Sequence, residues 1–169
     1  METSELIEII SRGEDGKNQF KADARNNTQL AAEMVAFCNS GGGRLFLGVS
    51  DNGSVSGLQR EDVSRLNLLI SDAATNLVKP SINPETENVR HPDGIVIVVK
   101  IPDGLSKPYM DNAGAIWVKS GSDKRKVTSR EEIQRMLQKS GLIHGDEVPA
   151  HGVSIASIDM DFFSAFYEK

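Results

Sequence analysis

The sequence predicts an α/β (α+β) fold, in which a mixed β-sheet is flanked by helices within a single domain. Helical periodicity and strand-like apolar runs alternate along the chain, which is the pattern of such a sheet. The 169 residues, 38% of them hydrophobic, suffice for one domain with a buried core. With 25% charged residues, the composition is that of an ordinary soluble globular protein.

Four segments have the apolar spacing of amphipathic helices. Asn27 or Thr28 is suited to cap the second helix, and the run from Thr128 to Glu131 forms a capping box for the fourth. Pro80 ends the third helix, and Gly141 ends the fourth. The four helices are expected at residues 3–11, 26–40, 61–78 and 131–140.

Short strands are expected between these helices. The run IVIVVKI is continuous and apolar, so we expect it in the middle of the sheet, joined to the preceding strand near Asp93 and Gly94. The strand that begins at Arg44 is closed by the turn signal Asp51-Asn52-Gly53 and is predicted to enter a hairpin. The strands are expected at residues 17–22, 44–50, 81–92, 95–101 and 115–120.

The last part of the chain differs from the rest. Residues 1–141 are expected to form the domain, and residues 142–169 are expected to form a linker and the start of a following element. Phe162, Phe163 and Phe166 would form an aromatic helical face there. Two alternatives stay open: this face folds back on the domain, or it belongs to a further domain.

Charge and cysteine content exclude several classes of protein. A formal net charge of -5 argues against a wholly basic nucleic-acid coat, although it leaves room for a local basic face. The single cysteine, Cys38, lies on the apolar face of its helix and predicts packing in a reducing setting. We find neither zinc-ligand spacing nor a signal peptide nor a membrane span, so we expect a cytoplasmic protein without a resident metal or cofactor.

Three consecutive glycines, Gly41 to Gly43, raise the question of a phosphate-binding loop. Such loops follow a strand and open a helix, whereas these glycines follow a helix and precede a strand. The free backbone groups at a helix C-terminus are carbonyls, and the dipole there repels anions. We therefore predict a structural turn with Gly41 as a left-handed C-cap.

The segment from Lys119 to Arg130, KSGSDKRKVTSR, holds five basic residues and one acid. We expect it to face outward as a docking surface for polyanions, with backbone amides near Gly121 and the following helix dipole adding to the attraction. A solvated hairpin without a ligand is the alternative, and Trp117 either stacks on a base or belongs to the core. The residues expected to contact nucleic acid are Lys119, Ser120, Ser122, Lys124, Arg125 and Lys126.

Three stretches together resemble one known family: AFCNSGGGRLFLGVSDNGSVSGL, IVIVVKIPDGLSKPYM and GAIWVKSGSDKRKVTSREEI. They resemble the Schlafen AlbA-type domain over roughly Glu14 to Leu137. This resemblance implies an AlbA-like fold and a DNA-binding domain at the N-terminus of bacterial and archaeal transcriptional regulators. It also implies that further regulatory domains follow such a domain.

The resemblance implies a second function as well. In the Schlafen branch, two glutamates and a later aspartate form a site that cleaves RNA with divalent metal ions. Glu14 and Gln19 match the two glutamate positions, Asp51 is the candidate for the aspartate, and Lys21 could stabilise developing charge. Because Gln19 replaces a glutamate, one negative charge is lost from that site.

The sequence thus favours a module that binds nucleic acid, DNA rather than RNA, through its basic segment. A divalent-metal-dependent nuclease with Glu14, Gln19, Lys21 and Asp51 as its catalytic residues is the alternative. A dimerisation or interaction domain, for instance in a homo-oligomer, stays open because the net charge is negative. No membrane partner is expected.

Overall fold

The structure is a computed structural model, and it describes residues 1–142. The linker and following element predicted for residues 142–169 lie, apart from Leu142, outside the described residues, as does the aromatic face. Within residues 1–142, no helix has the length and apolarity needed to cross a membrane.

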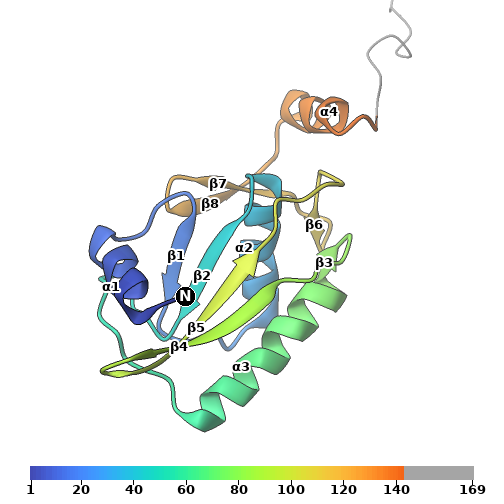
Figure 1. Ribbon diagram of the computed structural model, residues 1–169. Coiled ribbons are helices and arrows are strands. Elements are labelled where there is room, and N and C mark those ends of the chain that lie inside the picture. The colour runs from blue at the N-terminus through green and yellow to red at the C-terminus, as the bar shows by residue number, and fades with distance from the viewer. Residues whose placement is uncertain (143–169) are drawn as a thin grey trace, which may run out of the picture.

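The centre of the fold is a mixed sheet of four strands in the order β1-β2-β5-β4 (Figure 1). Strands β1 (Asn18–Lys21) and β2 (Gly43–Leu47) are parallel, whereas β5 (Gly94–Ile101) runs antiparallel to both β2 and β4 (Glu85–His91). The predicted mixed sheet is therefore confirmed, and so is the interior position of the apolar strand β5.

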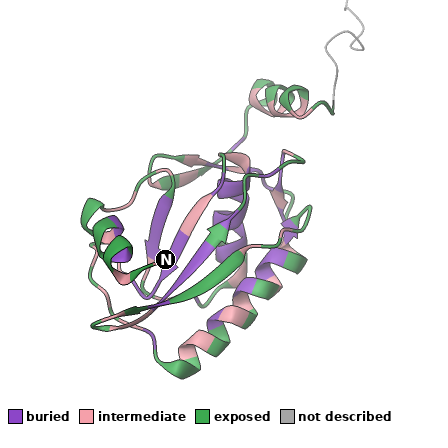
Figure 2. Ribbon diagram, viewed as in Figure 1, coloured by how far each residue is buried: buried purple, intermediate pink, exposed green. Residues whose placement is uncertain are grey.

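Helices cover both faces of this sheet, as Figure 1 shows. Helix α1 (Thr3–Arg12) packs on one face, and α2 (Asn27–Asn39) and α3 (Arg60–Asp72) pack on the other. Strand residues alternate between the two cores: Phe46 contacts the α1 side, and Leu45 and Leu47 contact the α2 side. Figure 2 shows that α2 is buried over most of its length, because it lies between the sheet and its neighbours.

Several element boundaries differ from the prediction. The third helix does not continue to Val78: α3 ends at Asp72 and is followed by a π-helical turn, η1 (Ala73–Leu77). Val78 instead starts β3 (Val78–Lys79), which pairs with β6 (Met110–Asp111). The cap of α2 is Asn26, whose side chain accepts hydrogen bonds from two backbone amides of the first turn. The strand β2 does not enter a long hairpin, since only Val49 and Val55 form a bridge across the turn.

The basic segment forms a hairpin at one end of the molecule (Figure 1). Strand β7 (Trp117–Ser120) pairs with β8 (Asp123–Lys126) and lies against α2. Helix α4 (Arg130–Lys139) follows, capped by Ser129 rather than Thr128. A small apolar cluster joins the helix to the hairpin through Ile116, Val118, Val127, Ile133 and Met136. The hairpin is thus held between α2 on one side and α4 on the other.

Candidate nucleic-acid interface

The three glycines form a structural turn, as predicted. Gly41 and Gly42 have φ values of 88° and 71°, which only glycine adopts readily. The amide of Gly42 closes the end of α2 by donating to the carbonyl of Phe37 at 2.8 Å. The ammonium of Lys17 caps the loop by donating to three carbonyls, of which that of Gly41 is nearest at 2.6 Å. A loop that presents carbonyls to a cation is unsuited to a phosphate.

The hairpin divides the basic segment between two faces. Lys119 is paired with Lys124 in the β7–β8 register, and side chains alternate along each strand. Lys119 and Lys124 therefore share the face that packs on α2, whereas Arg125 belongs to the face toward α4. The expectation that the whole segment faces outward was wrong for Lys119 and Lys124. Their partners lie in the body of the domain.

Glu33 of α2 is the centre of the cluster that receives these lysines. Its side chain is 1% exposed, and its Oε1 lies 2.5 Å from Nζ of Lys124 and 3.5 Å from Nζ of Lys21. A buried carboxylate needs such partners, because an unpaired charge in the interior is strongly destabilising. The sequence analysis missed Glu33, although it is the one charged residue between Leu30 and Cys38, a run that faces the core.

Lys119 meets a residue from the alternative catalytic set. Its ammonium donates to Oε1 of Gln19 at 2.8 Å and to the backbone carbonyl of Ser122, and it lies 4.9 Å from the ring centre of Phe37. Burial lowers the pKa of Lys119 below its usual value, although the carboxylates of Glu33 and Glu14 act in the opposite direction. Asp123 also acts on Lys119 as a nearby acid, and Lys124 acts on it as a nearby cation.

The other two residues of the alternative set have different positions. Glu14 lies near Lys119, and its Oε1 accepts a 2.7 Å hydrogen bond from the backbone amide of Phe20. Asp51 is exposed at its turn and lines a separate pocket of about 230 Å³, which Lys21 also lines. The structure therefore brings Glu14, Gln19 and Lys21 to the cluster, whereas Asp51 lines a pocket that it shares with Lys21 alone of these residues.

The residues present do not fit the divalent cation that the Schlafen resemblance implies. Within residues 1–142, no group of three or more His, Cys, Asp or Glu is placed to hold a metal ion. Gln19 accepts from an ammonium group, and Glu33 is in contact with two. A divalent cation needs oxygen ligands that are not already in contact with another cation, and here lysine ammonium groups contact the side-chain oxygens of Gln19 and Glu33. The chemistry of the cluster favours an anion.

Arg125 and Lys126 of the basic segment are both exposed, but their partners differ. Arg125 forms two hydrogen bonds to Glu132, at 2.5 and 3.0 Å, so its charge is matched by an acid of α4. Lys126 is exposed, and it has no acid within salt-bridge distance among the described residues. Ser120 is exposed, whereas Ser122 is half-buried.

Trp117 belongs to the core side of the hairpin. Its Nε1 donates to the carboxylate of the buried Asp111 at 2.8 Å, and its ring packs against the main core. The ammonium of Lys124 lies 5.9 Å from the ring centre. These contacts favour the core alternative for Trp117 over base stacking.

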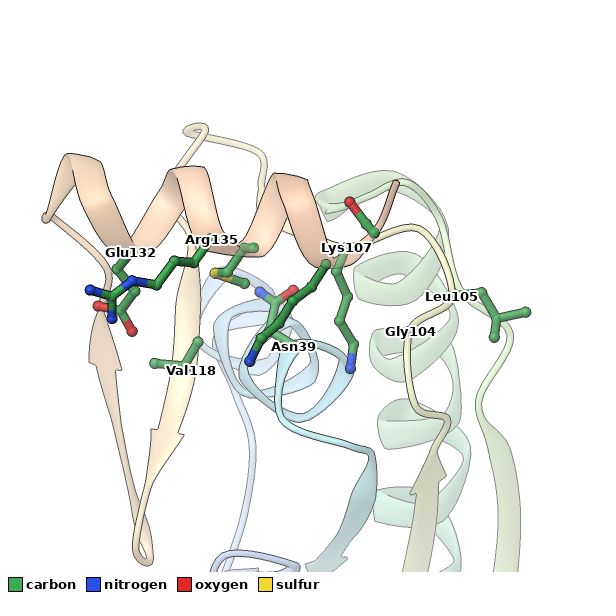
Figure 3. Close-up of a pocket in the computed structure, with 10 residues that line it drawn as sticks. Asn39, Gly104, Leu105, Lys107, Val118, Glu132 and Arg135 are labelled. Atoms are coloured by element: carbon green, nitrogen blue, oxygen red, sulfur yellow. The ribbon is translucent and has the colours of Figure 1, made fainter. Parts of the chain in front are cut away.

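A pocket of about 560 Å³ lies beneath α4 (Figure 3). Val118 and Met136 supply apolar walls, while Glu132, Arg135 and Lys107 supply charge. Figure 3 shows Glu132 and Arg135 projecting from α4 on the side of the hairpin. Because Val118 lies on the hairpin face opposite Lys119, this pocket and the lysine cluster are separate features.

Comparisons with known proteins find a matching family and similar solved structures. A family model described as Schlafen, AlbA_2 matches residues 14–128. The DIP2311 protein from Corynebacterium diphtheriae has a similar structure, with a TM-score of 0.57 and 18% sequence identity over 81% of this chain and 28% of that chain. The N-terminal domain of a RecG-related protein from Nitrosomonas europaea matches with a TM-score of 0.49 and 20% identity, over 77% of this chain and 96% of that chain. No curated protein matches the chain.

These matches differ in what they show. The likeness to the DIP2311 protein shows the fold alone, and the match spans 28% of the length of that protein. The family model spans more than half of this chain and includes β1, the three-glycine loop and the β7–β8 hairpin. On that match, the chain belongs to the Schlafen AlbA_2 family.

Proposed function

We propose that this domain binds nucleic acid, DNA in preference to RNA, through contacts between lysine side chains and phosphates. The observation that carries the proposal is the gathering of three lysines in a protein whose net charge is -5: Lys21 and Lys124 contact the carboxylate of Glu33, and the ammonium of Lys119 lies close by. An acidic protein that concentrates cations at one place has a local field that attracts polyanions. The family match supports the same function.

The surface beside this cluster extends the positive charge. Lys126 lies on the same hairpin face as Lys124, and Arg130 follows at the start of α4. Both side chains are exposed, and neither has an acid within salt-bridge distance among residues 1–142. Exposed basic side chains of this kind bind phosphate oxygens without reading sequence. Arg125 is expected to contribute less, because Glu132 already neutralises it.

We infer that the domain acts as the N-terminal module of a transcriptional regulator in the cytoplasm. The family match supports this role. The contacts proposed here, between basic side chains and phosphates, would not depend on base sequence. Such contacts position a protein on the duplex, and sequence readout needs further groups that reach base edges.

The test is a fluorescence anisotropy titration with labelled duplex DNA and single-stranded RNA. We expect the Lys126→Ala/Arg130→Ala double variant to bind DNA at least about tenfold more weakly than the wild type. Its log-log salt dependence should fall by about 1.8, since each neutralised phosphate contributes about 0.9 on duplex DNA.

The matched control is Arg60→Ala/Arg90→Ala, which removes the same charge. Arg60 begins α3 and Arg90 lies near the end of β4, away from the hairpin (Figure 1). This variant should keep the wild-type salt dependence. Absence of binding by the wild type, or an equal loss in both double variants, would overturn the proposed function.

A further inference from the structure

Glu33 forms ion pairs with Lys21 and Lys124, two of the lysines that the proposed function assigns to phosphate binding. Its Oε1 is shared by Nζ of Lys124 and Nζ of Lys21, at 2.5 and 3.5 Å. Its Oε2 is enclosed and has no hydrogen-bond partner among the described residues. The carboxylate is therefore held by the two ammonium groups rather than by backbone amides or hydroxyl groups.

The two lysines remain reachable from solvent. The side chain of Lys21 is 31% exposed and that of Lys124 is 25% exposed, against 1% for Glu33. Each lysine thus contacts the buried carboxylate through its ammonium while part of its side chain faces solvent. A phosphate oxygen that approached from outside would meet the same two cations, and it would also meet the repulsion of the negative charge beneath them.

Lys119 makes no direct contact with a carboxylate among the described residues. Lys119 adds a third ammonium group, which binds an amide oxygen and a backbone carbonyl instead of a carboxylate. Glu14 and Asp123 act on Lys119 from beyond salt-bridge distance, whereas Glu33 is the carboxylate that Lys21 and Lys124 contact directly among the described residues.

We propose that Glu33 is an internal counterion that competes with phosphate groups for Lys21 and Lys124. It holds the hairpin to α2 in the free protein, and its charge lowers the affinity of the same surface for a phosphodiester backbone. This inference rests on the proposed function, and it names the residue that sets the strength of binding.

The test replaces Glu33 with its neutral isostere. Glu33→Gln should bind the labelled duplex at least about tenfold more tightly than the wild type, because removal of the competing charge frees two cations. The variant should melt at a lower temperature than the wild type in buffer alone, and the duplex should raise its melting temperature more than it raises that of the wild type. A residue with a purely structural role would lower stability without increasing affinity.

Glu85→Gln is the matched control. Glu85 also pairs with a lysine, Lys100, but both side chains are largely exposed and belong to β4 and β5. This substitution removes the same charge at another place, so affinity should stay within about twofold of the wild type. An equal gain in both variants would mean that only net charge matters, and would overturn the role of Glu33.

A second pair of variants covers the case in which Glu33→Gln does not fold. Glu33→Gln/Lys124→Gln replaces a buried ion pair with a neutral pair, which cores tolerate better than a single unpaired charge. It should bind DNA more tightly than Lys124→Gln alone, because Lys21 is freed. Equal or weaker binding would overturn the inference and leave the proposed function standing if the wild type binds. No binding by the wild type or by any variant would overturn both.

Discussion

The ammonium of Lys119 lies 2.8 Å from the amide oxygen of Gln19, a residue 100 positions earlier in the chain. This contact joins the basic hairpin to the edge strand β1 of the sheet. It also joins one residue of the predicted binding set to one of the alternative catalytic set. The amide oxygen accepts a hydrogen bond, but it brings no charge to balance the ammonium.

We predict that Gln19→Glu stabilises the domain by about 1 kcal/mol at neutral pH. The new carboxylate would pair with a partly buried ammonium that lacks a direct carboxylate partner, and charge-assisted hydrogen bonds are the stronger kind. It would also raise the pKa of Lys119. Urea unfolding measures the effect, with Gln19→Met as the control that removes the acceptor and should destabilise by about 1 to 3 kcal/mol. Similar losses in both variants would contradict the prediction.

The lowered pKa of Lys119 predicts a pH dependence of stability. Burial lowers this pKa below its usual value of 10.5, so the folded state releases the proton before the unfolded state does. Between the two pKa values the unfolded state binds more protons, and the free energy of unfolding therefore rises with pH. At lower pH the lysine is charged in both states, and the cost of burying that charge is fully present.

The measurement compares the wild type with Lys119→Gln by urea unfolding from neutral pH to about pH 10. We expect the free energy of unfolding of the wild type to rise relative to that of the variant as pH approaches 10.5. A difference between the two proteins that does not change with pH would contradict this.

Much of the fold is predictable because individual segments carry clear signals. Strand β5 has a long apolar run, and α1 has a sharp apolar stripe, so local sequence suffices for both. Strands β3 and β6 contain two residues each, and no periodicity can reveal a segment that short. Gly48 shows another limit: with a φ of 99°, it turns the chain so that Val49 packs on the α1 side. Regular strand alternation would have placed Leu47 and Val49 on the same face.

The candidate site is less predictable than the fold. The sequence placed Lys119 and Lys124 in a basic segment. Strand alternation shows which side chains share a face once the register of the two strands is known, but it does not show what that face contacts. Which face meets α2 depends on contacts made across the whole chain. Glu33 shows the same difficulty, because a single acid in an apolar helix identifies a buried charge without naming the lysines that stabilise it.

The thiol of Cys38 should be inert in the folded protein. Its side chain is fully buried, and burial raises its pKa to about 12. Since the thiolate is the reactive form, labelling by a thiol reagent at pH 8 should be at least about a thousandfold slower than for the unfolded chain in urea. Rapid labelling without denaturant would show that α2 opens frequently.

The turn between α2 and β2 should tolerate no side chain at Gly43. A Cβ at this position would overlap the ring of Phe37 and lie 2.8 Å from the carbonyl oxygen of Lys17. Both neighbours are fixed, one in the core and the other in the backbone next to β1, so we expect Gly43→Ala to destabilise by about 2 kcal/mol. Gly16→Ala is the control: its nearest atom would be 3.7 Å away, and its stability should stay within about 0.5 kcal/mol of the wild type or rise. Chemical denaturation compares the two, and equal stabilities would mean that the turn is looser than the packing of Phe37 implies.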